Sequence, residues 1–480
     1  MLDEDVVIKT TRNVNETVLV WNVVLAVLIP FIFFGGSSDI LTGLFVSLGV
    51  VAPINTLNYM FTWQPRPHIQ TMKFGAYCLP FIVLLGISIF GIYNGGIDSV
   101  ILGGYVYNYI GDMKDCLMIN VSPSALNSIL ENLVTFFAFL CGLSIFLITD
   151  SRFVIRKFLV WTSSLGALIT VLGCLLMFTW NFEGSIFANT TDDFFSIFPC
   201  SAHWASWGIL WLGASLAVAI FSVQRFRSFS FFYSLRFLCL VTSMVLYACI
   251  LIAGKPLHQI FGSLIFAVAI SMICYDMIPL KMNARKHEML RHISSHSKRL
   301  KKLQFPFVCY GLLACLSWIV AISITVDICN NSKLLFVDEG NPNSITYVEK
   351  MSVIEDAMRM LSEDRFMFGY GSASFPWIFS LHQGSDLGVQ PWKSPNSDLL
   401  HELVENGVIG IILSALPFVY FFVRWLVKMQ FSRSGMIMMM SVVSILLLSI
   451  VEIPFQNIAV LVSFWVVAMS VFRWDDAKVG

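Results

Sequence analysis

The sequence predicts an all-α integral membrane protein with about twelve transmembrane helices and one large, partly helical loop between the ninth and tenth spans. Hydrophobic residues make up 57% of the chain and charged residues 12%, which is far from the composition of a water-soluble domain. A hydrocarbon core of about 30 Å requires roughly 20 apolar residues per helix. Runs of that length occupy residues 18–36, 39–61, 75–94, 129–149, 158–180, 203–223, 234–253, 260–280, 305–327, 406–424, 435–452 and 457–472.

Basic residues predict how these spans are oriented, because Lys and Arg favour cytoplasmic loops. The densest basic segment, residues 281–302, joins the eighth and ninth spans, and smaller basic groups follow the even-numbered spans. Both termini are therefore expected in the cytoplasm, and the loop of residues 328–404 on the outer face. The formal net charge of zero hides this asymmetry and gives no indication of nucleic-acid binding.

Three of the eleven cysteines lie outside the predicted spans on the outward side: Cys116, Cys200 and Cys329. An oxidising compartment there would permit a disulfide between Cys116 and Cys200. Free thiols are the alternative, and the sequence leaves both open.

The outer loop is the main candidate for a catalytic platform. Apolar residues recur in it at intervals of three and four, which predicts an amphipathic helix; they are Ile345, Val348, Met351, Ile354, Met358 and Leu361. Charged residues are expected on its other surfaces. The helix either lies on the membrane with its charges solvated, or presents Arg359 or Arg365 to a phosphate group, which a guanidinium can bind bidentately.

Residues 394–413 join a polar helix directly to the tenth span. Asp398, Glu402 and Glu405 recur at i, i+4 and i+7, so they share one helical face, and His401 lies within one turn of it. Titratable groups at this junction would lie at the membrane surface. A lipid-linked substrate would be accessible to them there.

Residues 368–375, FGYGSASF, form a small-residue segment flanked by aromatic residues. Its glycines permit a tight turn or the close approach of a ligand to backbone amides. No strand precedes it, so it is not a nucleotide-binding fingerprint.

Taken together and in this order, the amphipathic helix, FGYGSASF, a Gly-, Pro- and Trp-containing spacer and PNSDLLHELVENGVIGIIL resemble the bacterial O-antigen ligase and O-antigen polymerase superfamily of membrane glycosyltransferases. The resemblance covers roughly residues 250–425. Counting back from Gly407, Asn396 occupies the position of the family's motif histidine, and Lys255 occupies the place of an arginine near the seventh span. Asparagine cannot act as a base, and this favours a polymerase over a ligase.

The resemblance implies a reaction in which an acceptor hydroxyl attacks a glycan on undecaprenyl diphosphate and the lipid diphosphate leaves. Positive charge must stabilise that leaving group. The residues expected to bind it are Lys255, Arg359 and Arg365, with Lys350 and Lys393 as weaker candidates and Asn396 as a further substrate-binding residue. Those expected to orient or deprotonate the hydroxyl are His401, Glu405, Glu402 and Asp398. No cofactor is expected, and no metal site, because no histidine combines with carboxylates at ligand spacing along the sequence.

We therefore expect a polymerase that joins lipid-linked repeat units into a surface polysaccharide at the periplasmic face of the bacterial inner membrane, with a chain-length regulator as a further partner. The alternatives are a ligase that transfers polymer to lipid A core and a polysaccharide transporter. Three regions are expected: an N-terminal bundle (1–253), the family-like region with spans eight to ten (254–425), and a C-terminal pair of spans (426–480).

Overall fold

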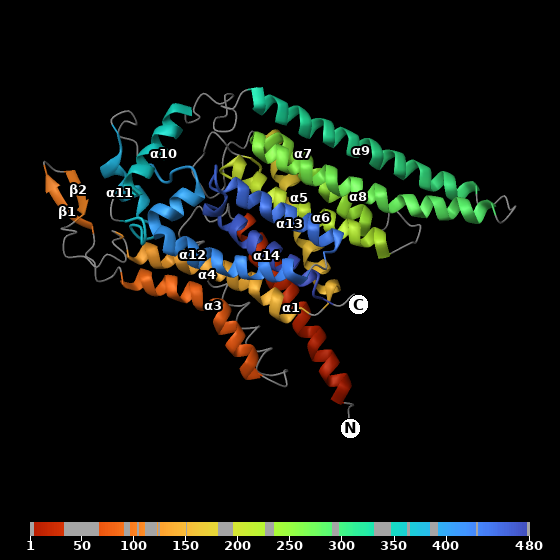
Figure 1. Cartoon of the computed structure of the whole chain (residues 1–480), viewed down its shortest axis with the longest axis horizontal. Helices are drawn as coiled ribbons and strands as arrows, with labels where there is room; N and C mark the ends of the chain where they lie inside the picture. Colours follow the sequence, from red (N-terminus) through yellow and green to blue (C-terminus); the bar gives the residue numbers. More distant parts are fainter. Residues whose placement is uncertain are drawn as a thin grey trace.

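The structure, a computed structural model, describes residues 4–32, 67–90, 97–102, 105–110, 122, 125–149, 151–180, 195–225, 235–289, 297–330, 347–361, 365–384, 392–428 and 431–477. Helices dominate these residues (Figure 1). Six of the described helices are long and apolar enough to cross a membrane; they are α3 (Pro67–Phe90), α4 (Ala125–Ile148), α5 (Arg152–Trp180), α6 (Ser201–Arg225), α8 (Pro256–Met289) and α12 (Asp398–Lys428). This is the architecture of a helical, multi-pass membrane protein.

Shorter apolar segments lie in α1 (Glu4–Ile32), α7 (Leu235–Ala253), α9 (Ser297–Asn330), α13 (Arg433–Leu448) and α14 (Ile458–Trp474). The predicted span at residues 39–61 lies outside the described residues, so the total of twelve remains a prediction. Each of the other predicted spans coincides with one of these helices. The eleventh was predicted to extend to residue 452, but α13 ends at Leu448, and residues 449–457 form a turn that contains the short helix η6 (Pro454–Gln456).

Helix α6 lies at the centre of the bundle. The residues of its apolar segment are buried, and it packs against α5, α7, α8, α13 and α14. Trp204, Trp207 and Trp211 recur along it and are fully buried. Small residues on neighbouring helices make room for these rings: a Cβ at Gly166 of α5 would lie 2.2 Å from the Trp207 ring. Close helix packing at small residues is typical of membrane bundles, where dispersion replaces the hydrophobic effect between helices.

The helical fold is confirmed, and the described residues also contain one hairpin that was not predicted, in which β1 (Ile97–Leu102) and β2 (Tyr105–Ile110) pair antiparallel. Their sequences, IDSVIL and YVYNYI, are rich in β-branched and aromatic residues, and Gly103-Gly104 stands between them in the sequence, a composition favoured in two-residue hairpin loops. The hairpin lies at the same end of the molecule as α10 (Tyr347–Leu361) and α11 (Phe375–His382), at the left of Figure 1, whereas the C-terminus lies toward the other end.

The region between α9 and the apolar part of α12 has its own hydrophobic core, formed by α10, α11 and the start of α12. Its buried residues are Val353, Ala357, Met360, Leu361, Tyr370, Phe375, Ile378, Phe379, Leu400 and Val404. The predicted amphipathic helix is thus present as α10, but its buried face differs from the prediction. Met351 and Met358 are 38% and 54% exposed, whereas Lys350 and Asp356 are buried. Val353, Ala357 and Met360 are buried on this face, and Asp356 accepts a hydrogen bond from the Gly384 amide at 2.8 Å.

Candidate functional site

Helix α12 consists of two segments that meet at Gly407, where the backbone is non-helical (φ 64°, ψ −170°). Regular helical bonds would join the amides of residues 408 and 409 to the carbonyls of residues 404 and 405. Instead, the carbonyls of Val404 and Glu405 accept hydrogen bonds from the amides of residues 370 and 371, at 3.0 and 2.6 Å. The amides of Val408 and Ile409 donate to the carbonyls of residues 366 and 367, at 3.1 Å each. The turn at residues 366–371 is therefore inserted into the helix.

Glycine is required on both sides of this junction. The φ and ψ of Gly407 lie in a region that is essentially restricted to glycine, and a Cβ there would lie 2.4 Å from the Met367 carbonyl oxygen. Gly369 has φ 66°, and its Cβ would lie 2.3 Å from the Glu405 carbonyl oxygen. The sequence had suggested that FGYGSASF and the ENGVIG segment belong together, and the structure brings them into direct contact.

Glu405 anchors this turn. Its side chain is 2% exposed, and its two carboxylate oxygens accept hydrogen bonds from the backbone amides of Ala373 and Phe375, at 2.9 Å each. Phe375 is the first residue of α11, where unpaired amides favour a negative charge. Glu405 therefore has a structural role in addition to the catalytic role predicted for it.

A hydrogen-bonded chain ties the same turn to α4. Asn132 Nδ2 donates to Ser372 Oγ at 2.8 Å, and Ser372 Oγ donates to Asn406 Oδ1 at 2.8 Å. Asn132 also donates to Ser88 Oγ of α3 at 2.7 Å. Four chain segments are thus connected at one end of the bundle, and this fixes α4 opposite the first segment of α12.

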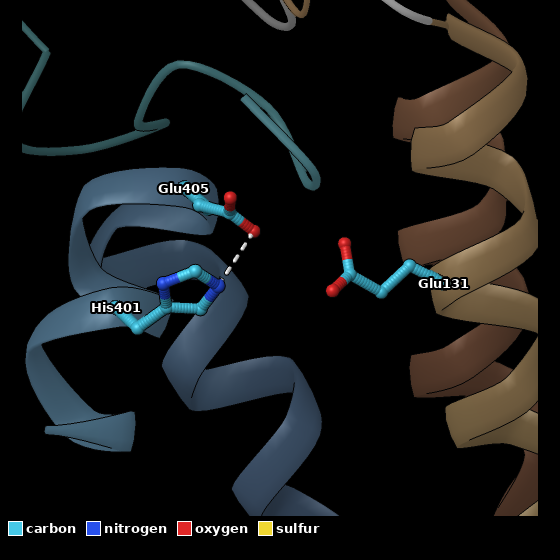
Figure 2. A group of neighbouring side chains, drawn as sticks. All are labelled: Glu131, His401 and Glu405. Carbon is cyan, nitrogen blue, oxygen red and sulfur yellow. Dashed lines mark ion pairs between the residues drawn. The ribbon is translucent and has the colours of Figure 1, made fainter. Parts of the chain in front are cut away.

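Across that contact, Glu131 of α4 points toward His401 and Glu405 (Figure 2). His401 Nε2 lies 3.4 Å from Glu405 Oε2, and the imidazole side chain is 12% exposed. Glu131 was not among the residues predicted from the sequence, all of which lie in the C-terminal half of the chain. An ionisable residue inside the predicted span 129–149 was the available indication, since such residues are costly in a membrane and commonly functional.

Asp398 anchors the start of α12 to the turn that follows α13. Its Oδ2 accepts a hydrogen bond from the Phe455 amide at 2.7 Å, and its own amide donates to the Glu452 carbonyl at 3.0 Å. Asp398 also lies close enough to His401, Glu402 and Glu452 for their charges to interact. It therefore connects the His401 region to a second group of charges.

That second group consists of Lys255, Lys350 and Glu452. The Lys255 Nζ lies 3.2 Å from Glu452 Oε2, and the Lys350 Nζ lies 3.8 Å from Glu452 Oε1. Burial by itself raises the pKa of the Glu452 carboxyl, but Lys255 and Lys350 outweigh burial and hold this pKa below its ordinary value of 4.5. Burial lowers the pKa of the Lys350 ammonium, and Glu452 opposes that effect. Of the residues predicted to bind the diphosphate, these two lysines form one cluster.

The other predicted phosphate ligands have different surroundings. Arg359 is 67% exposed and pairs with Glu355 at 2.7 Å and with Asp356 at 3.2 Å. Arg365 lies over the Tyr370 ring, 5.9 Å from its centroid. Asn396 has a left-handed backbone (φ 57°), and its buried Nδ2 has no hydrogen-bond partner among the described residues. A buried amide of this kind is available to donate to a ligand.

Lys393 is exposed and Glu402 is partly buried beside His401 and Glu405. Cys116 lies outside the described residues, and so does its proposed pairing with Cys200.

The fold and these contacts define a helical, multi-pass membrane protein with a polar site at the end of the bundle covered by α10 and α11. The site contains an acidic group with one histidine and, beside it, a pair of lysines that share one glutamate. No protein-family model matches the chain, and no curated protein is significantly similar to it in sequence.

Proposed function

We propose that this protein is a membrane glycosyltransferase that polymerises undecaprenyl-diphosphate-linked oligosaccharide repeat units, as the resemblance to the O-antigen polymerase and ligase superfamily implies. One observation carries the proposal: the first turn of α12 separates two groups of opposite chemistry. Lys255 and Lys350 lie on one side, and His401 with its neighbouring carboxylates lies on the other. Asp398 links them, because its amide donates to the carbonyl of Glu452, the glutamate that the two lysines share, and its carboxylate lies near His401.

The lysine pair suits the leaving group. Two ammonium groups converge on a single carboxylate, so the cluster carries an excess positive charge that a diphosphate would balance. Preorganised cations of this kind stabilise the charge that develops as the lipid diphosphate departs. The orphan amide of Asn396 supplies a further hydrogen-bond donor. Arg359 and Arg365, on the same outer loop, are proposed to contact the approaching donor rather than to complete this cluster.

The acidic group suits the acceptor. His401 is held by Glu405 at 3.4 Å, and Glu402 and Glu131 lie nearby. An imidazole paired with a carboxylate is a good general base for a sugar hydroxyl, and such catalysis typically contributes about 10²- to 10⁴-fold in rate. His401 takes the proton in this scheme, and Glu405 orients the imidazole. No nucleotide-sugar site is required, because the donor arrives activated on its lipid.

The function is tested by comparing lipopolysaccharide ladders from the source strain with and without the gene. A polymerase deletion leaves lipid A core carrying at most one repeat unit, and the ladder returns with the wild-type gene but not with Lys255→Ala. A ligase deletion instead removes every repeat from the core while lipid-linked polymer accumulates. A transporter deletion leaves lipid-linked single repeats on the cytoplasmic face. Either of the last two results would refute the polymerase proposal.

The proposal also fixes the topology, with both termini in the cytoplasm of a bacterium and the loop of α10 and α11 in the periplasm. Single cysteines at Gly340 and Gly384 should react with an impermeant maleimide added to intact spheroplasts, in a background in which the exposed native cysteines have been replaced. A cysteine at Ser294, in the basic segment, should react only after the membrane is opened. Labelling of Ser294→Cys from outside would reverse the orientation and place the lysine cluster on the wrong side for a periplasmic polymerase.

A further inference from the structure

Three side chains from two helices converge where α4 faces the first segment of α12: Glu131, His401 and Glu405 (Figure 2). One ligand atom from each lies within 4.8 Å of the other two. The His401 Nε2 and the Glu405 Oε2 are 3.4 Å apart, which matches the separation of about 3.4 Å between ligands of a tetrahedral ion with bonds of about 2.1 Å. We propose that these three side chains form a binding site for a divalent cation.

Each of the three groups has a donor atom to offer. A carboxylate oxygen has two lone pairs, so both oxygens of Glu405 retain one after accepting the amide hydrogen bonds of Ala373 and Phe375. The Nε2 of a neutral His401 is a standard metal ligand. Glu131 is exposed, and one of its carboxylate oxygens lies within 4.8 Å of a ligand atom on each of the other two residues.

Two of the ligands are held in place before any ion arrives. The two backbone amides fix the Glu405 carboxylate, and the His401 ring lies against Phe375 with 5.5 Å between ring centroids. Prepositioned ligands reduce the entropy lost on binding. Glu131 supplies the third ligand from α4, on the facing side of the site (Figure 2).

The local charges also favour a cation. Glu131, Glu402 and Glu405 lie close enough to repel one another, and His401 is the basic group among them. The nearest lysine cluster is paired with Glu452. Like charges in a poorly solvated site raise its energy, and a divalent cation would offset this repulsion.

The ligand set narrows the class of ion. Imidazole favours Zn²⁺ and related transition metals, whereas carboxylates also suit Mn²⁺. One histidine with two carboxylates therefore favours a first-row transition-metal ion such as Mn²⁺ or Zn²⁺. Ca²⁺ is disfavoured, because it prefers six to eight oxygen ligands. Three protein ligands leave positions open for water or a substrate oxygen. The inference concerns cation binding alone. An ion on His401 Nε2 would occupy the lone pair that His401 needs as a general base, so cation binding and the base role proposed for His401 are alternatives at this nitrogen.

The test uses the full-length protein purified in detergent micelles, stripped with EDTA and titrated with Mn²⁺, with free Mn²⁺ followed by electron paramagnetic resonance. The wild type should bind one equivalent, and Zn²⁺ should displace it. Glu131→Gln should weaken binding by more than about 10-fold, since even changes behind the ligands cost about 10- to 100-fold. Glu131 is the informative position because Glu405→Gln would also disturb the turn that Glu405 holds.

Glu355→Gln is the matched control, because Glu355 is an exposed glutamate on α10 that pairs with Arg359. It should bind Mn²⁺ as tightly as the wild type. Pulsed measurements on bound Mn²⁺ should also show a nitrogen coupling that disappears in His401→Gln. The proposal is overturned if the wild type binds no Mn²⁺, if Glu131→Gln binds it as tightly as Glu355→Gln, or if bound Mn²⁺ shows no histidine nitrogen.

Discussion

Replacing Gly407 by alanine tests the insertion of the 366–371 turn into α12. The backbone of Gly407 lies in a region that costs other residues about 1–3 kcal/mol. The added Cβ would also lie 2.4 Å from the Met367 carbonyl oxygen, so the turn must move away. That movement weakens the four backbone hydrogen bonds across the junction, each of which contributes about 1 kcal/mol. We expect a loss of roughly 2–6 kcal/mol in the free energy that keeps this junction closed.

Hydrogen exchange measured by mass spectrometry reports this loss directly. The relevant peptides contain the amides of Tyr370, Gly371, Val408 and Ile409, which the junction protects. At the lower limit of about 2 kcal/mol, their exchange should accelerate by roughly 30-fold, because each 1.4 kcal/mol corresponds to about tenfold. The protein should still insert into the membrane, since the central core around α6 does not involve this turn.

Gly86→Ala in α3 is the matched control, because a Cβ at Gly86 meets nothing within 4 Å. Alanine is a better helix former than glycine by about 1 kcal/mol, so this variant should be as stable as the wild type or slightly more stable, with unchanged exchange at the junction. If Gly407→Ala left the four amides fully protected, the kink would not depend on glycine and the arrangement described above would be wrong.

Three further substitutions test the charged groups. Glu452→Gln should cost about 3–5 kcal/mol of stability in a denaturant titration, because it leaves the Lys350 ammonium buried without its partner, and the additional change Lys350→Met should recover most of that loss. Because the folded-state pKa of Glu452 lies below 4.5, its stabilising effect is complete above that pH and is lost as the pH falls through the folded-state value; the wild type should therefore lose more stability than Glu452→Gln on acidification. His401→Ala should reduce polymer by about 10²-fold or more at an unchanged protein level in membranes, and normal ladders would exclude His401 as the base. Glu405→Gln should reduce both polymer and resistance to proteolysis near α11, whereas Glu355→Gln should change neither.

Local features of the sequence were sufficient for the helices. Runs of about 20 apolar residues predict spans because an unpaired backbone cannot lie in the hydrocarbon, and the helices of the described residues lie where those runs predict them. The three- and four-residue periodicity similarly predicted α10. The hairpin of β1 and β2 was not predicted, although its β-branched and aromatic residues and the Gly-Gly between them are typical of hairpins.

Which face of a helix is buried depends on partners that are distant in sequence. The periodicity of α10 favoured burial of Met351 and Met358, but the buried face is rotated toward Val353, Ala357 and Met360. On this face Lys350 pairs with Glu452, and Asp356 accepts a hydrogen bond from the Gly384 amide. Apolar periodicity gives only the face that a helix would on average prefer to bury. Polar contacts to distant segments act together with the burial of Val353, Ala357 and Met360 in setting which face of α10 lies inward.

The sequence by itself determined that this is a membrane protein, where its helices run, and that His401, Glu402 and Glu405 share one helix. Only the tertiary structure decided which groups meet them: Glu131 lies about 270 residues before His401, and Glu452 joins Lys255 to Lys350 from a third segment. Periodicity and composition carry information about one helix turn or one membrane span at a time. The geometry of the site, in contrast, arises from helix packing and from the two glycines that let one segment enter another, and both depend on the whole chain.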